Sequence, residues 1–436
     1  MEILTNPITL SVLVMCVLCL FKVNVMFSLL LSAIVAGVVG GVEIGETFSI
    51  LVGGMGGNAE TALSYILLGT FAAALAHIGI SDAFARKIAT MVKGRKIVLF
   101  VVLIVCAVLS QTLVPVHIAF IPILIPPLLV VMNKMQLDRR SAACALAYGL
   151  KAPYIALPIG FGLLFQGLIS DSMTQNGMSV EPLEVWHSTW ILGIGMTVGM
   201  IASLFYFSKK RQYKDVVITA PVTTIEHVSK TSKRTNIVSI LSIFATLFFQ
   251  LSFSSMPIGA IAGILVLIIG GALKINDFDK VIADGIKLMG LIAFVMLIAS
   301  GYGAVIKSTG AVDTLISATL PYLGDNKLIS ATIMILIGLL TTMGIGTSFG
   351  TVPILAVIYV PMAQKLGFST EATIVLIAAA AALGDAGSPA SDTTMGPTSG
   401  LNADNQHNHI WDTCVPTFLF YNIPLIIFGI LGALFF

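Results

Sequence analysis

The chain has 436 residues, of which 57% are hydrophobic and only 10% are charged, and its mean hydropathy is +1.00. Soluble globular domains carry about 25% charged residues, so this composition excludes a soluble protein and indicates a polytopic membrane protein. The formal net charge is +2, and the basic residues lie in predicted loops rather than on one face. The charge pattern therefore gives no indication of a nucleic-acid partner.

Apolar runs follow one another along the chain, and most are long enough to enter or cross a hydrocarbon core about 30 Å thick. They cover residues 8–21, 25–42, 62–79, 97–114, 118–132, 142–169, 189–207, 236–253, 257–273, 288–306, 328–344, 349–363, 371–395 and 413–436. Two pairs of short runs, 97–114 with 118–132 and 328–344 with 349–363, are interpreted as re-entrant hairpins that return to their own side of the membrane. The expected fold class is an all-α polytopic membrane protein.

The second half of the chain repeats the first at one fixed offset, without a gap. This offset superposes Gly79 and Gly310, Asp82 and Asp313, Lys96 and Lys327, Pro122 and Pro353, Lys134 and Lys365, and Pro158 and Pro389. Apolar matches alone arise easily by chance, but glycines, prolines and charges in register indicate a duplication. We predict two repeats, residues 1–207 and 236–436, joined by a basic linker at 208–235.

Each repeat is expected to hold five transmembrane helices with a re-entrant hairpin and a broken helix. Because an odd number of crossings turns the second repeat upside down, the two repeats are predicted to be inverted. Loops 80–96 and 133–140 and the linker are rich in Lys and Arg, whereas residues 43–61 and 170–188 contain six acidic residues and no Lys or Arg. The basic loops are therefore expected in the cytoplasm, and residues 43–61 and 170–188 are expected to form external loops. We predict a multi-pass protein of a bacterial inner (plasma) membrane with both termini outside.

The most polar stretch inside an apolar run lies at residues 384–394, which read Gly-Asp-Ala-Gly-Ser-Pro-Ala-Ser-Asp-Thr-Thr. In lipid, an unwound backbone and an ionisable side chain are each costly unless protein or a water-filled cavity surrounds them. The hairpin tip of the same repeat, residues 344–351, is also rich in Gly, Ser and Thr. Carbonyls, hydroxyls and carboxylates suit a small cation such as Na⁺, and half-helix N-termini suit an anionic group. These two breaks predict an ion or substrate site.

The first repeat carries different chemistry at the matching places. Its broken helix contains Lys151 and Pro153, and its hairpin tip contains His117. The repeat thus brings two groups that can carry positive charge towards the midplane where the second repeat brings Asp385 and Asp392. An unpaired buried lysine would be costly, so a partner is expected. A structural ion pair, a proton-coupling pair and a clamp for a substrate carboxylate are all compatible with this pattern.

Two other patterns invite a metal-binding or an enzymatic interpretation. His407 and His409 lie in a polar segment with Asp404 and Asp412, which we interpret as a solvated loop rather than a metal site. Residues 346–350 fit G-x-S-x-G, but the nucleophile elbow of that motif needs a strand-to-helix turn in a soluble sheet. An internal repeat has no explanation in a hydrolase, whereas alternating access requires one. We expect no enzymatic activity, and neither a metal beyond the coupling ion nor a cofactor.

Residues 346–351 (Gly-Thr-Ser-Phe-Gly-Thr) together with the motif at 384–394 resemble the NhaC-type Na⁺/H⁺ antiporter family of the ion transporter superfamily. The tail at 395–416 is similar to the YuiF-like branch, whose members are regarded as candidate amino-acid, including histidine, transporters. The resemblance covers nearly the whole chain and implies inverted repeats, a homodimer and a moving transport domain. By motif match it implies a cation site formed by Asp385, Ser388, Ser391, Asp392 and Thr393, with Thr347 and Ser348 from the hairpin.

The chain contains no nucleotide-binding motif, so an ion gradient is the expected energy source. We hypothesise a secondary active transporter, coupled to Na⁺ or H⁺, that moves a small carboxylate-bearing solute such as the amino acid histidine. The candidate substrate-binding residues are Lys151, His117, Pro153, Thr347, Ser348 and Gly387. The alternative is a Na⁺/H⁺ antiporter without an organic substrate, in which Asp385 or Asp392 exchanges Na⁺ for protons. A passive channel is a third class, which saturable flux with counterflow would exclude.

Overall fold

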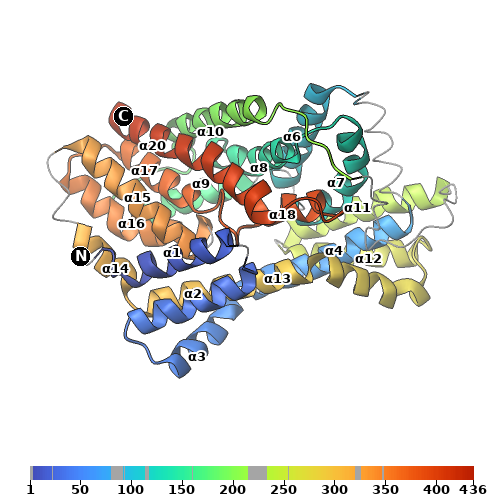
Figure 1. Ribbon diagram of the computed structural model, residues 1–436, viewed down its shortest axis with the longest axis horizontal. Coiled ribbons are helices and arrows are strands. Elements are labelled where there is room, and N and C mark those ends of the chain that lie inside the picture. The colour runs from blue at the N-terminus through green and yellow to red at the C-terminus, as the bar shows by residue number, and fades with distance from the viewer. Residues whose placement is uncertain are drawn as a thin grey trace.

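The computed structural model describes residues 3–21, 23–79, 92, 94–112, 117–159, 161–214, 233–253, 255–319, 326–345 and 348–436. Within these ranges every regular element is a helix and no strand occurs, which confirms the all-α fold class. Figure 1 shows an elongated bundle in which the long helix α13 (Phe278–Ser308) runs across the middle.

The helices of the first half include both the predicted hairpin runs and the predicted broken helix. They are α1 (Pro7–Leu20), α2 (Val25–Val39), α3 (Ile44–Gly54), η1 (Met55–Asn58), α4 (Ala59–His77), α6 (Lys96–Thr112), α7 (His117–Lys134), α8 (Arg139–Ala156), α9 (Phe161–Gln175) and α10 (Trp186–Tyr206). The chain leaves the helical conformation at Leu157, because Pro158 disfavours a helical residue before it. The helices α8 and α9 are bent by 47° at this break.

The second half has the same order of helices, with π-helical turns before its last helix. They are α11 (Lys233–Phe253), α12 (Met256–Ile269), η2 (Ile275–Asp277), α13, α14 (Ala311–Thr319), α15 (Lys327–Ile345), α16 (Ser348–Lys365), α17 (Thr370–Leu383), α18 (Asp392–Leu401), η4 (His409–Cys414), α19 (Val415–Thr417), η5 (Phe418–Asn422) and α20 (Ile423–Phe435). Helix starts keep the offset found in the sequence, as at Val25 and Met256, His117 and Ser348, and Phe161 and Asp392.

Several of the described helices have the length and composition of membrane spans. Three qualify outright, at Trp186–Tyr206, Met289–Ser308 and His409–Phe435, and up to five qualify if each of two bent pairs is one span. Seven further helices of the described chain contain shorter apolar stretches of 10–17 residues. Exposed apolar side chains also line α11, where Ile240 and Phe244 are 54% and 63% exposed. Such a surface suits lipid tails rather than water.

Residues 43–61 were expected to form an external loop, and this expectation is wrong. They contain α3, η1 and the start of α4, and the pair formed by Ile44–Gly57 and Ala62–His77 is bent by 51°. The acidic residues that indicated a loop, Glu43 and Glu46, lie at the first turn of α3. Carboxylates at a helix N-terminus interact favourably with the helix dipole, so these residues are compatible with a helix start.

Small residues let α4 and α13 pack backbone against backbone. A Cβ added at Gly285 would lie 2.5 Å from the Cα of Thr70, and one added at Gly69 would lie 3.0 Å from the carbonyl oxygen of Gly285. Close approach through glycines is how helices associate within lipid. In Figure 1 the α6 and α7 helices lie towards the opposite end of the bundle's long axis from α15 and α16.

Candidate functional site

The break between α17 and α18 is a polar segment enclosed by protein. Residues 384–391 are all buried, and α18 restarts at Asp392 with Ser391 as its N-cap. Gly387 has a φ of +87°, and a Cβ there would lie 2.5 Å from the Cβ of Phe418. Glycine is required for both the left-handed backbone and this close approach. The sequence thus folds into a tight, non-helical turn against the last span.

The carboxylate of Asp385 lies at the centre of this break and accepts hydrogen bonds from three hydroxyl groups. Tyr154 Oη donates to Asp385 Oδ2 at 2.9 Å, and Ser348 Oγ donates to the same oxygen at 3.2 Å. Ser391 Oγ donates to Asp385 Oδ1 and accepts from the Thr393 backbone N–H at 3.1 Å. The donors come from α8, α16 and the α18 cap, so one carboxylate joins both halves of the chain.

Lys151 of α8 is the charge partner of Asp385. Its Nζ lies 3.4 Å from Asp385 Oδ2 and donates to the carbonyl of Ala382, and the side chain is fully buried. Two buried charges are tolerated only when they are paired and hydrogen-bonded, as they are here. The offset between the halves places Lys151 on Ala382 and Tyr154 on Asp385. Matching positions of the two halves therefore meet at this point.

A cavity of ≈ 70 Å³ opens beside Asp385. It is lined by Gln111, Leu150, Tyr154, Phe161, Met296, Ser348, Phe349, Asp385, Asp392 and Thr393. Since about 10–15 Å³ of such space holds one water, the cavity has room for several waters, a cation or a small polar group. Phe161, Ser348 and Asp392 are the first residues of α9, α16 and α18, so three positive helix ends point their first turns at it.

The predicted site residues fall into two groups. The structure brings Lys151, Ser348, Asp385, Ser391, Asp392 and Thr393 together around the cavity or directly behind it. Lys151 itself is not on the wall, because its Nζ is occupied by Asp385 and Ala382. Pro153 lies in the last turn of α8, and Ser388 and Gly387 turn towards the last span. Thr347 and the side chain of His117 lie outside the described residues.

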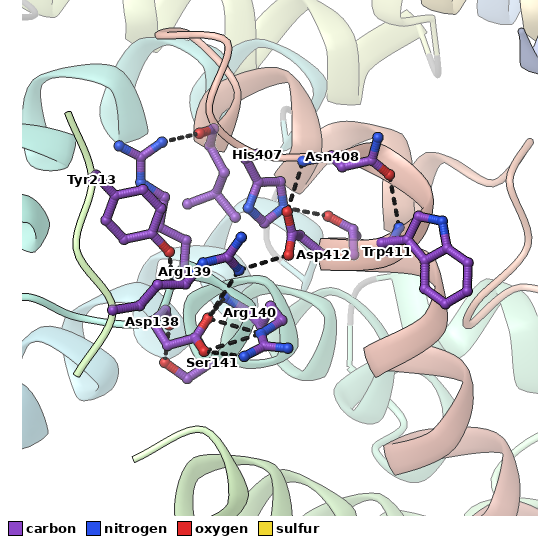
Figure 2. A network of polar contacts seen from close by, with 12 residues as sticks. Asp138, Arg139, Arg140, Ser141, Tyr213, His407, Asn408, Trp411 and Asp412 are labelled. Carbon is purple, nitrogen blue, oxygen red and sulfur yellow. Dashed lines mark hydrogen bonds and ion pairs between the residues drawn. The ribbon is translucent and has the colours of Figure 1, made fainter. Parts of the chain in front are cut away.

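A second polar cluster lies where α8 begins, and Figure 2 shows the part of it around Asp138, Arg140 and Asp412. Arg139 Nη1 and Nη2 donate to the carboxylate of Asp404 at 2.6 and 2.5 Å, and both side chains are almost completely buried. Arg139 Nη1 also donates to the Leu401 carbonyl at 2.9 Å. This bidentate pair fastens the start of α8 to the segment that follows α18.

Further ion pairs extend the cluster to the segment after α10. Arg140 Nη2 donates to Asp138 Oδ2 at 2.6 Å, and Arg211 Nη1 donates to Asp412 Oδ1 at 2.7 Å. Tyr213 Oη accepts a hydrogen bond from the Arg139 backbone N–H at 3.0 Å (Figure 2). The segment 402–412 is therefore packed against protein, and the expectation of a solvated loop is wrong.

Charge and burial displace the pKa of two groups in this segment. Burial alone raises the pKa of the Asp404 carboxyl, but the hydrogen bonds and charge of Arg139 outweigh it, so the pKa lies below its ordinary value. Burial lowers the pKa of His407, whose Nε2 lies 2.7 Å from Thr413 Oγ1. His407 is therefore neutral at pH 7 in the folded protein.

Sequence reasoning missed Tyr154, Gln111 and the Arg139–Asp404 pair. Tyr154 could have been found from the repeat, because the offset places it on Asp385. The ion pair joins residues 265 positions apart and has no local signal in the sequence. Gln111 lies near the end of the apolar run 97–114, just before the hairpin tip, where a single polar residue carries no signal of its own.

Apolar helices that surround a buried, charged helix break and an enclosed polar cavity define a polytopic membrane transporter rather than an enzyme. The chain belongs to the Na⁺/H⁺ antiporter family, whose sequence profile matches residues 145–432. A second profile, described as a Na⁺-H⁺ antiporter family, matches residues 6–92.

Full-length relatives agree with this assignment. The chain is 46% identical to an uncharacterised membrane protein of Vibrio parahaemolyticus, over 98% of this chain and 99% of that relative. It is 44% identical to YuiF of Bacillus subtilis, whose name proposes amino acid transport, with the same coverage of both chains. Among solved structures it is similar to the YdaH transporter of Alcanivorax borkumensis, at 16% identity, a TM-score of 0.45, and coverage of 89% of this chain and 87% of that one.

Proposed function

We propose that the protein is a secondary active transporter, coupled to Na⁺ or H⁺, for a small solute that carries a carboxylate. An amino acid is the solute class that we propose, with histidine as the first to test. The relative YuiF, whose name proposes amino acid transport, supports the same class. The coupling ion would be held by Asp385, Ser388, Ser391, Asp392 and Thr393.

The observation that carries this proposal is the meeting of opposite charges around one cavity. Asp392 lines the wall, while α9, α16 and α18 turn their positive N-terminal ends towards the same space. A zwitterion or a cation–anion pair fits such a wall better than either charge alone. Because Lys151 is occupied by Asp385, the helix ends, rather than Lys151, would meet the solute carboxylate.

We also propose the inverted-repeat architecture for residues 1–207 and 236–436. Reciprocal contacts support it: the α4–α13 contact at Gly69 and Gly285 has its counterpart at Gly54, whose carbonyl accepts from Ser300 Oγ at 2.8 Å. The sequence offset between the halves converts one contact into the other. A true two-fold relation between repeats produces such reciprocity.

Orientation and assembly complete the proposal. By the positive-inside rule, the cluster of Arg139, Arg140 and Arg211 would mark the cytoplasmic end, with residues 208–235 as the cytoplasmic linker and both termini outside a bacterial inner membrane. We propose a homodimer, as the family resemblance implies, in which hairpin and broken-helix elements move as a transport domain. Size-exclusion chromatography with light scattering would test the dimer.

A second candidate function is Na⁺/H⁺ exchange without an organic substrate. The buried Lys151–Asp385 pair favours it, since protonation of such a carboxylate would free the lysine and couple ion release to proton uptake. Under this alternative Lys151→Ala would mainly shift the pH dependence of Na⁺ transport. Under the amino-acid proposal it would disturb Asp385 and weaken ion coupling.

Uptake into proteoliposomes separates the two candidates. A pool of labelled amino acids is supplied with and without an inward Na⁺ gradient, beside a pH-sensitive dye inside the vesicles. Accumulation that collapses in Asp392→Ala supports coupled amino-acid transport. Na⁺-driven proton movement without solute uptake would instead establish the antiporter.

A further inference from the structure

One residue of the first half lines the cavity with a polar side chain whose oxygen has no partner among the described residues. Gln111, the penultimate residue of α6, is only 5% exposed and lines the cavity together with Asp385 and Asp392. In the part of the chain that the structure describes, its Oε1 has no hydrogen-bond partner. A buried amide oxygen without a donor destabilises the fold. Its presence at the cavity therefore points to a ligand.

The matching position of the second half indicates that the fold does not need this group. The offset between the halves places Gln111 on Thr342 of α15, whose Oγ1 donates to the Ala380 carbonyl at 2.8 Å. A short side chain at this place thus satisfies its hydrogen bonds within its own half. The longer side chain of Gln111 instead belongs to the cavity lining, and its amide oxygen has no partner among the described residues.

The surroundings decide which kind of ligand the oxygen suits. Asp385 is already held by Lys151 and by hydroxyl donors, whereas the wall also carries Asp392 and the rings of Phe161 and Phe349, whose centroids are 4.8 Å apart. Carboxylate, amide oxygen and aromatic faces all attract positive charge. A carboxylate ligand would gain nothing from Oε1, because it has no proton to donate to it.

We propose that the carbonyl oxygen of Gln111 is a ligand for the cationic group that binds in the cavity beside Asp392. The cation is either the ammonium group of a solute or a bare Na⁺, and this inference rests on the proposed transport function. Gln111 would then determine specificity from the first repeat, opposite the carboxylates of the second.

The test is Gln111→Leu in the full-length protein, reconstituted in proteoliposomes with a pool of labelled amino acids and radioactive Na⁺ as probes. The KM for one probe is expected to rise roughly ten- to hundredfold, the size of one hydrogen bond to a charged group, with a smaller change in maximal rate. A rise for the amino acids alone identifies the ammonium group as the ligand, and a rise for Na⁺ alone identifies the coupling ion.

A matched control is Gln250→Leu on α11. Gln250 is 4% exposed and its Oε1 also lacks a partner among the described residues, but it does not line the cavity. Unchanged KM values for both probes in Gln111→Leu, or an equal rise in Gln250→Leu, would overturn the inference. Should Gln111→Leu fail to fold, Gln111→Glu replaces it. That variant should lower the KM of the cation, and an unchanged or raised KM contradicts the inference.

Failure of the proposed function would look different from failure of this inference. If the wild type takes up no amino acid but exchanges Na⁺ for protons, the amino-acid proposal is wrong. The Na⁺ arm of the Gln111 test still gives a result in that case, because its readout is the KM for Na⁺.

Discussion

The helix pairs α8–α9 and α17–α18 occupy matching places in the chain, yet their breaks differ in chemistry. All of residues 384–391 are buried, whereas in the other break Leu157 and Ile159 are 44% and 51% exposed. The α8–α9 pair contributes from within α8 instead, through Lys151 and Tyr154. Matching positions of the two pairs thus meet, but the carboxylate lies on the α17–α18 pair, and two of the groups that contact it, Lys151 and Tyr154, lie on the α8–α9 pair.

The N-terminal ends of the two pairs differ as well. The start of α8 is held by the buried Arg139–Asp404 pair, whereas α17 starts with a Ser369 cap, whose Oγ accepts from the Ala372 N–H at 3.0 Å. Near that end, Gln364 Nε2 donates to the Gly177 carbonyl at 3.1 Å, in an exposed contact. Separating the start of α8 from the protein around it would therefore require more free energy than separating the start of α17.

The largest effect is expected from Asp385→Asn, which neutralises the buried break and leaves Lys151 without a charge partner. Transport should fall at least about 100-fold, because an unpaired buried charge disrupts the site. Proteoliposome uptake measures this loss. Asp171→Asn, at an exposed position of α9, is the control and should retain uptake. Normal transport by Asp385→Asn would show that the polar break is only structural.

Arg139→Ala should be the most destabilising change at the helix starts. Breaking a buried pair lowers the free energy of unfolding by about 3–5 kcal/mol, while the matching Thr370→Ala should change it by less than about 0.5 kcal/mol. Thermal unfolding in detergent compares the two variants. The double variant Arg139→Met with Asp404→Leu should recover most of the loss, and a double variant as unstable as the single one would contradict this account.

The ion-paired end should also carry a pH dependence that the other end lacks. The folded-state pKa of His407 is lowered. Its contribution to the free energy of unfolding is therefore complete above the ordinary pKa of 6.5 and is lost as the pH falls below that value. The loss should approach about 1.4 kcal/mol per pH unit. Asp404, with its lowered pKa, adds a further loss only below its ordinary value of 3.8. Between pH 8 and 5, the free energy of unfolding should depend less on pH in His407→Gln than in the wild type. The same pH dependence in both proteins would exclude His407 as the cause.

A small loss of stability is expected at the cap of α17. Ser369→Ala should cost about 1 kcal/mol, the usual value of an N-cap. Asp138→Ala, at the matching cap of α8, should cost more, since Asp138 also pairs with Arg140. Equal losses in the same unfolding assay would mean that the ion pairs of Asp138 add nothing to its capping.

Helix positions and breaks could be predicted because apolar runs, prolines and the fixed offset are visible in the sequence. The polar side chains of residues 384–394 that lie around the cavity were also recognisable, since polar groups inside an apolar run are costly without a role. The helix α3 was missed because its acidic first turn resembled a loop. The Arg139–Asp404 contact could not be predicted, because a polar segment has the same composition whether water or distant protein surrounds it.

The central claim is that the cavity between the two helix pairs binds solute and coupling ion together. Its most direct test is equilibrium binding of a labelled amino acid, chosen from the uptake screen, to purified wild type and Asp392→Ala with and without Na⁺. The account predicts that Na⁺ tightens binding to the wild type and that Asp392→Ala loses this effect. Na⁺-dependent binding that is unchanged in Asp392→Ala would contradict it.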